Sequence, residues 1–318
     1  MSFVLRISSR VSRQWAGRIL CLSGWLAAPV LPAHDSPEHV IAQLSGQITR
    51  RGESAELLSR RGTEHRVLYH LDQAVSDFLE AIKLDPHHLP ARRELGRVYL
   101  EQGKIPEAIE CASRALAAAH DPGDRAPFHM IRAEAYDAAH EDRKALADCN
   151  LAFAASPAEL DWYLIRSQIQ GRLGQWQACC DGLKKGLEET GSAMLEIEWI
   201  EALLDARRAR EALPEIERQL AQSHWRSSWL LRRARARLAL GEKFAARQDL
   251  QNALSEINRR LTSPRPDLAL LADRGFTFAL LGDKEAAEKD LHAAQQLGAD
   301  EWVLRRLQNY LKPPTPGR

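Results

Sequence analysis

The chain has 318 residues, 45% of them apolar, and it carries 44 Lys and Arg against 43 Asp and Glu, with five Cys. This balance lacks the clustered surplus of cations that DNA or RNA binding requires. Five scattered cysteines are also too few for a small scaffold held by disulfides. The composition therefore argues against a nucleic-acid-binding protein and leaves room for one elongated domain or two globular ones.

Residues 1–33 have the features of an export signal. They contain four Arg and no acid, so the rest of the chain carries 40 basic against 43 acidic side chains. The uncharged stretch Ile19–Leu31 spans about 20 Å as a helix, which is shorter than the roughly 30 Å hydrocarbon core of a bilayer. We predict a signal peptide cleaved after Ala33, a periplasmic or secreted protein, and no stable membrane span after cleavage. An organellar presequence and an uncleaved membrane anchor are the alternatives.

From residue 55 onward a pattern recurs about every 34 residues. Small residues occupy the eighth place of every block except the weaker fifth one and the twentieth place of every block, and mostly larger apolar residues occupy the twenty-fourth: Gly62, Ala74 and Phe78 in the first block, and Gly275, Ala287 and Leu291 in the last. Small side chains allow two helices to approach closely. We place about seven repeats at 55–88, 89–122, 126–159, 160–192, 193–226, 227–260 and 268–301. Small inserts near Asp121–Arg125 and Leu261–Asp267, the first of which carries Pro122 and Gly123, are expected to form loops.

A charge pairing accompanies the repeat. Where the seventh place of a block is Arg, the twenty-third tends to be Asp, and in the second block both places turn apolar together, as Leu95 and Cys111. Because a buried charge without its partner is costly, such joint changes indicate contact. We predict structural ion pairs between Arg61 and Asp77, Arg132 and Asp148, Arg233 and Asp249, and Arg274 and Asp290.

The repeat resembles the tetratricopeptide repeat, across nearly all of residues 55–301. The resemblance implies an all-α fold, an α-solenoid of antiparallel helix pairs (A and B) wound into a right-handed superhelix. It also implies a concave groove lined by A-helix residues that receives a partner protein or peptide. Carried onto this sequence, the groove residues are Arg66, Arg93, Arg97, Glu134, Asp137, Glu201, Asp205 and Arg235, which would make it basic, then acidic, then mildly basic. Phe276 and Leu280 would line its last part.

Both flanks are expected to cap the stack of repeats. Residues 34–54 contain Ser36 and Pro37, a typical helix start, followed by apolar residues at helical spacing. Residues 302–311 form a second amphipathic segment that covers the last repeat. The Pro-rich residues 312–318 are expected to be disordered.

No catalytic motif is evident. The sequence lacks a phosphate-binding glycine loop, a Gly-x-Ser-x-Gly elbow and a His-Glu-x-x-His helix. His87 and His88 fall in a predicted turn and are interpreted as solvated, while Cys111 and Cys149 occupy places for small buried residues, with a bridge between them left open. Four tryptophans are expected to pack inward: Trp162, Trp176, Trp225 and Trp229. We therefore predict no enzyme activity, no cofactor and no metal.

The sequence thus favours a non-enzymatic scaffold that binds a partner protein in its groove. One alternative is an architectural or chaperone-like subunit that uses the convex face or the ends of the solenoid. The other is a metal-binding or hydrolytic protein that uses His87 and His88 or the central acids. A shared fold does not identify the partner, because this scaffold is compatible with many ligands.

Overall fold

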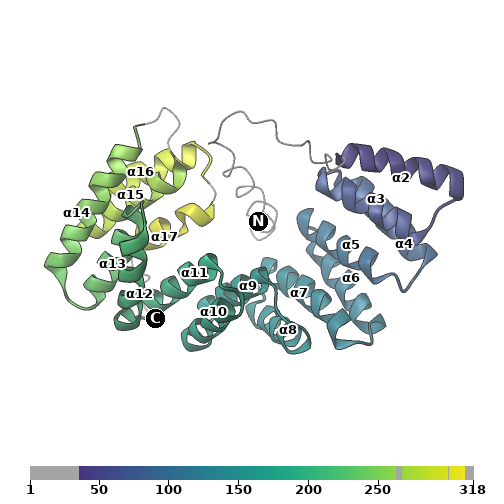
Figure 1. Cartoon of the computed structure of the whole chain (residues 1–318), viewed down its shortest axis with the longest axis horizontal. Helices are drawn as coiled ribbons and strands as arrows, with labels where there is room; N and C mark the ends of the chain where they lie inside the picture. The colour runs from purple at the N-terminus through teal and green to yellow at the C-terminus, as the bar shows by residue number, and fades with distance from the viewer. Residues whose placement is uncertain (1–35, 263–266, 300, 312–318) are drawn as a thin grey trace, which may run out of the picture. The chain divides into compact units, whose positions relative to one another are not determined.

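The computed structural model describes residues 36–262, 267–299 and 301–311. Every regular element in these ranges is an α-helix, from α2 to α17 (Figure 1). The predicted all-α helical-repeat fold is therefore confirmed. The predicted signal peptide and C-terminal tail lie outside the described residues, as do residues 263–266 between two of the predicted repeats.

The chain divides into two compact units, residues 1–175 and 176–318, which we call the N-terminal and C-terminal units. The described helices of the N-terminal unit are α2 (Pro37–Arg51), α3 (Ala55–Val67), α4 (Leu71–Leu84), α5 (Leu89–Glu101), α6 (Ile105–Ala118), α7 (Pro122–Ala138), α8 (Asp142–Ala155) and α9 (Leu160–Arg172). Those of the C-terminal unit are α10 (Trp176–Thr190), α11 (Ala193–Asp205), α12 (Ala209–Gln222), α13 (Ser227–Ala239), α14 (Lys243–Arg260), α15 (Leu268–Leu281), α16 (Lys284–Gln296) and α17 (Glu301–Leu311).

Within each unit, consecutive helices pack against one another. Alternate helices, two apart in the chain, also contact one another along one side. In the N-terminal unit α3, α5, α7 and α9 form one such row, and in the C-terminal unit α11, α13 and α15 form another. We call these the A helices, and the helices that follow them the B helices. The A helices of each unit therefore lie side by side and present one continuous face, whose residues are described below.

Small residues stand where helices approach most closely. At Gly62 on α3, a methyl group would lie 2.8 Å from Cε1 of Phe78, which is fully buried on α4. At Gly275 on α15, a methyl group would lie 2.6 Å from a methyl carbon of Leu307 on α17 and 3.1 Å from Cβ of Asp290. Since real side chains do not approach so closely, a small residue at the eighth place is a packing requirement in these two repeats.

The four Arg–Asp pairs join helix A to helix B within a repeat. In each, Nε and Nη2 of the Arg donate to the two carboxylate oxygens of the Asp over 2.6–2.9 Å: Arg61 with Asp77, Arg132 with Asp148, Arg233 with Asp249, and Arg274 with Asp290. All four Asp residues are buried, and so are Leu95 and Cys111 at the matching places of the second repeat. Such bidentate, charge-assisted bonds raise the pKa of each Arg.

The turn between helix A and helix B has one fixed requirement, a residue with positive φ. Glycine meets it in four turns, at Gly103, Gly174, Gly241 and Gly282, and a non-glycine residue meets it in three, at Tyr69 (φ 65°), His140 (φ 60°) and Arg207 (φ 60°). Left-handed backbone is unfavourable for residues with a Cβ. These three residues therefore carry local strain that the other turns avoid.

One predicted loop is helical. Pro122 and Gly123 do not interrupt the chain before the third repeat, because α7 already begins at Pro122. Proline is tolerated at the first position of a helix, where its missing N–H would have had no partner within the helix. The proline there starts the helix, and α7 is four residues longer at its N-terminus than the block inferred from the sequence.

Both flanking segments are helices that pack on their neighbouring repeat. α2 begins at Pro37, and Oγ of its N-cap Ser36 accepts a hydrogen bond from the backbone N–H of His39 at 3.4 Å. At the other end, Leu304 and Leu307 of α17 are buried against α15 and α16. In the described ranges, no helix is long and apolar enough to span a membrane.

Candidate functional site

The A-helix face of the N-terminal unit carries charged side chains from α3, α5 and α7, where the sequence predicted a groove. Arg66 lies at the C-terminal end of α3 and reaches the neighbouring α5. Its Nη1 donates to Oε1 of Glu101 at 2.7 Å, and its Nε lies 3.1 Å from Oε2 of Glu94. Glu94 is only 6% exposed, and a carboxylate buried to this degree needs an opposite charge such as this Arg beside it.

The same arrangement recurs further along the chain. Arg172 of α9 pairs with the buried Asp137 of α7, and also with Asp142 of α8, over 2.7 Å. In the C-terminal unit, Arg235 of α13 pairs with Glu201 and Asp205 of α11, the latter over 2.8 Å. Each Arg thus bridges its own helix to the A helix of the preceding or following repeat.

These bridges change the charge distribution expected from the sequence. Five of the eight predicted groove residues, Arg66, Asp137, Glu201, Asp205 and Arg235, are engaged in ion pairs between repeats. Neighbouring repeats therefore neutralise much of the charge that the sequence placed along the groove, and Arg93, Arg97 and Glu134 lie outside these bridges. The sequence analysis overlooked Glu94 and Glu101 as partners of Arg66. They follow Arg66 by 28 and 35 residues, close to the 34-residue repeat length, and this spacing was the signal that could have found them.

Two arginines of α5 remain available to a partner. The side chains of Arg93 and Arg97 are 43% and 42% exposed. Their contact within the chain is a 3.4 Å approach of each to Oε1 of Glu94, whose other oxygen lies against Arg66. Three guanidinium groups thus face Glu94, and Glu101 pairs with one of them, so an anion on a partner would balance the remaining positive charge.

Glu134 of α7 supplies the acidic side of the same face. Burial is the main cause that raises the pKa of Glu134 to about 7, and the nearby Asp161, Asp137 and Glu159 raise it further, while Arg97 lowers it. Burial and Glu159 also raise the pKa of Asp161 on α9. Arg97 and Glu134 are therefore close enough to interact, and the face presents cations on α5 beside acids on α7 and α9.

The C-terminal unit offers less of its A-helix face. Phe276, expected to line the groove, is 5% exposed and packs edge-on against Tyr310 of α17, with ring centroids 5.6 Å apart. The cap expected at 302–311 therefore lies over this part of the face, and Phe276 packs against it instead of lining an open groove. The candidate site is accordingly the A-helix face of the N-terminal unit around Arg93, Arg97 and Glu134.

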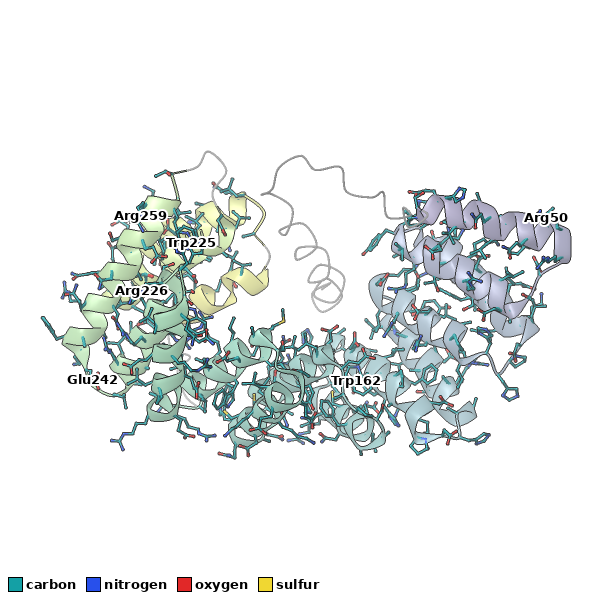
Figure 2. All side chains as sticks on the ribbon, viewed as in Figure 1. Arg50, Trp162, Trp225, Arg226, Glu242 and Arg259 are labelled. Atoms are coloured by element: carbon teal, nitrogen blue, oxygen red, sulfur yellow. The ribbon has the colours of Figure 1, made fainter. Side chains whose placement is uncertain are left out.

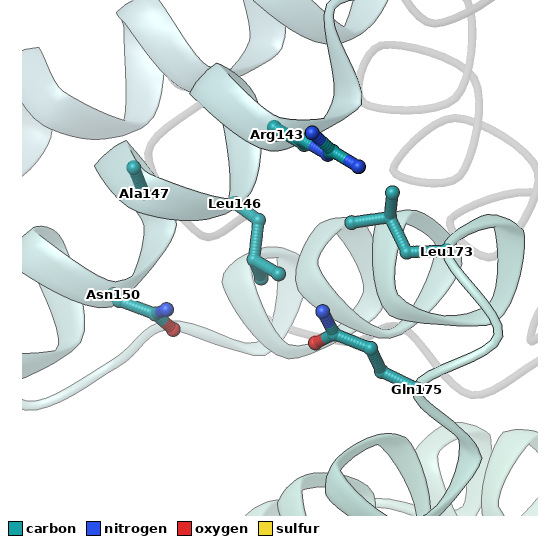
Figure 3. Close-up of a pocket in the computed structure, with 6 residues that line it drawn as sticks. All are labelled: Arg143, Leu146, Ala147, Asn150, Leu173 and Gln175. Carbon is teal, nitrogen blue, oxygen red and sulfur yellow. The ribbon is translucent and has the colours of Figure 1, made fainter.

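A separate open hollow of about 390 Å³ lies on the N-terminal unit. It is lined by α8 and by the turn after α9, with Arg143, Leu146, Ala147, Asn150, Leu173 and Gln175 (Figure 3). None of these side chains is an acid, a thiol or an imidazole, so the lining offers no general base at neutral pH. The hollow does not carry the predicted function.

The histidines and cysteines have structural surroundings. Nδ1 of His88 accepts the backbone N–H of Ala91 at 3.1 Å and so caps α5, whereas His87 is exposed. Cys111 and Cys149 are buried free thiols, and burial raises their pKa to about 11 and about 12. Across the ranges the structure describes, no group of three His, Cys, Asp or Glu side chains is arranged to hold a metal ion.

The tryptophan expectation holds in part. Trp162 and Trp229 are buried and Trp176 is half-buried, as inward packing requires, but Trp225 is 52% exposed (Figure 2). Trp225 directly precedes the N-cap residue of α13, in the connection after α12. The prediction that it packs inward is wrong, because this connection places it outside the layer between the helices.

Comparison with known proteins identifies the repeat. The profile of the tetratricopeptide repeat family matches residues 69–135. No curated protein sequence matches the chain. Among solved structures, a tetratricopeptide repeat protein from Parabacteroides merdae ATCC 43184 is 18% identical, with a TM-score of 0.56 over 87% of this chain and 99% of that one.

Two further solved structures are similar over shorter spans. MamA from Desulfovibrio magneticus RS-1 is 20% identical, with a TM-score of 0.43 over 58% of this chain and 94% of that one. A thermophilic tetratricopeptide repeat protein from Thermus thermophilus is 24% identical, with a TM-score of 0.43 over 58% and 99%. At such identities, the resemblance to the Parabacteroides protein establishes the fold and nothing about a ligand.

Proposed function

Since this chain is a tetratricopeptide-repeat protein, we propose that it is a non-enzymatic scaffold that binds a segment of a partner protein on the A-helix face of its N-terminal unit. The observation that carries the proposal is the pair Arg93 and Arg97, which are two-fifths exposed and share one carboxylate that Arg66 already occupies. Elsewhere on the predicted groove, most charges are already paired between repeats.

The partner segment is proposed to carry a carboxylate or phosphate for these two arginines. Guanidinium groups bind such anions through paired hydrogen bonds, which gives direction as well as affinity. A neutral or cationic group beside that anion would suit Glu134, because burial disfavours its charged form and raises its pKa. The fixed ion pairs between A helices hold the face in one arrangement, so binding needs little ordering of the scaffold.

A photo-crosslinking amino acid at the exposed position 90, one helical turn before Arg93 on α5, tests the proposal in cells or extracts and keeps both arginines. We expect a crosslinked partner at this position and none at position 114, where Arg114 lies exposed on the B helix α6 and pairs with Glu110 of its own helix. The double variant Arg93→Glu with Arg97→Glu should lose the partner, whereas Arg114→Glu should keep it. Crosslinks from position 114 alone would point instead to a scaffold that uses its other face.

We also propose that residues 1–33 direct export, with cleavage after Ala33. The basic, acid-free leader and its short apolar stretch support this proposal. Mass spectrometry of the chain recovered from its native cells should give an N-terminus at His34. An intact N-terminus in a membrane fraction would instead support an uncleaved anchor.

A further inference from the structure

The exposed Trp225 of the C-terminal unit is held by its neighbours in one orientation. The guanidinium carbon of Arg260 lies 4.3 Å from the centroid of the Trp225 rings, and the ring of His224 meets them edge-on at 4.8 Å. Arg260 comes from the end of α14, a different helix from the connection that carries Trp225. The indole is thus fixed from two sides while 52% of the residue stays in contact with water.

The backbone beneath the indole is fixed as well. The N–H of Arg226 donates to both carboxylate oxygens of Glu256, at 3.0 and 3.2 Å. Nη1 of Arg260 donates to Oγ of Ser227 at 3.4 Å and lies 3.7 Å from Glu256. This one carboxylate is therefore occupied by the connection and by Arg260.

The charge around the indole is positive. Arg226 follows Trp225 directly and Arg259 precedes Arg260, and both residues are exposed (Figure 2). Together with Arg260 they supply three positive charges, and Glu256 supplies one negative charge. An exposed aromatic ring that is already ordered loses little entropy on binding, and Trp together with Arg is the combination that dominates many protein interfaces.

We propose that His224, Trp225, Arg226, Arg259 and Arg260 form a second docking surface, which binds an acidic segment of a partner protein with an apolar side chain seated on Trp225. The charge surplus selects the acidic segment, and the exposed indole selects the apolar residue within it. This surface lies in the other unit from Arg93 and Arg97 and does not depend on the function proposed for them.

Phe244 provides a matched control. It is 88% exposed near the start of α14, whereas Arg260 ends the same helix sixteen residues later. At 1.5 Å per residue the two positions are about 24 Å apart along the helix. Replacing Phe244 removes an exposed aromatic ring without touching the proposed surface.

Fluorescence anisotropy with synthetic peptides tests the proposal on the full chain. The probes are a labelled 12-residue peptide of Asp and Glu with two Leu, the same peptide with Gly for Leu, and the same peptide with Lys for the acids. We expect the acidic peptide with Leu to bind more tightly than the other two, and more weakly as salt rises. Trp225→Ala should weaken it by about tenfold or more, and Arg226→Glu with Arg259→Glu should abolish binding.

Several outcomes would overturn the proposal. They are no binding of the acidic peptide, equal binding of the Lys peptide, or the same loss with Phe244→Ala as with Trp225→Ala. Loss of the peptide in Arg93→Glu with Arg97→Glu would place it on the other surface. Binding of phosphatidylserine vesicles through Trp225 without binding of the peptide would make the surface a membrane contact instead. Circular dichroism of each variant confirms that it is folded.

Discussion

The ion pair between Arg274 and Asp290 offers the sharpest test of the repeat's internal design. Asp290 is 4% exposed and accepts two bonds from Arg274, at 2.8 and 2.7 Å. Replacing Arg274 with Leu leaves this carboxylate buried and unpaired. Because the side chain of Arg274 is 27% exposed and water can reach part of the site, we expect a loss of about 3 kcal/mol, at the low end for a broken buried pair.

The double change should restore most of that loss. The chain itself already uses an apolar version of the pair in its second repeat, Leu95 with Cys111, beside a glycine at the same place as Gly275. Arg274→Leu combined with Asp290→Cys should therefore unfold within about 1 kcal/mol of the original chain. Asp290→Cys alone leaves a partly exposed Arg that retains Asn258 as an acceptor at 3.3 Å, so we expect a loss of only about 1–2 kcal/mol.

Urea denaturation under reducing conditions, followed by circular dichroism, measures these differences. Hydrogen exchange of α15 and α16 provides a local measurement, because stacked repeats need not unfold in one step. The reasoning predicts a coupling energy of about 3 kcal/mol between the two changes. If the double variant loses the sum of the two single losses, the pair is not the unit that we describe.

Three further changes test the packing, the turns and the charges. In the same urea titration, Gly62→Ala should lower the unfolding free energy by about 1 kcal/mol, because the ring of Phe78 must move to admit the methyl group. Gly46→Ala on the open face of α2 should raise the unfolding free energy by about 0.5–1 kcal/mol, because Ala has the better helix propensity and meets only Arg50 there. Arg207→Gly should raise the melting temperature, by relieving about 0.5–1 kcal/mol of left-handed strain, and an unchanged value would remove the strain argument. The pKa of Glu134 is raised from 4.5 to about 7, so folding takes up a proton and the unfolding free energy falls as pH rises through this window. In calorimetry, Glu134→Gln should remove about 1–2 kcal/mol of that fall between pH 5 and pH 8. An unchanged dependence of stability on pH would contradict the burial of Glu134.

The sequence was sufficient to predict the helical repeat, because its signals are local and periodic. Gly62 and Gly275 recur at matching places, and the Arg–Asp pairs recur with one spacing, since every repeat solves the same packing problem. The second repeat has Leu95 and Cys111 in place of the Arg and the Asp, and this joint change could be seen in the sequence because the spacing of the pair is constant. Such patterns arise inside one repeat and need no knowledge of its neighbours.

The sequence was a poorer guide to the surface, where neighbouring repeats interact. Arg66 looks like a free groove cation until α5 brings Glu94 and Glu101 against it. Phe276 looks available until α17 covers it, and Trp225 looks like a core residue until the connection turns it outward. For Arg66 and Phe276 the exposure depends on a second helix, and for Trp225 it depends on the path of the connection. Single positions within a repeat specify neither.

Hydrogen exchange of the full chain with and without its captured partner would locate the binding face. Binding should slow exchange in α3, α5 and α7, on the face that carries Arg93, Arg97 and Glu134, and should leave α4, α6 and α8 unchanged. Protection confined to α4, α6 and α8 would contradict this prediction.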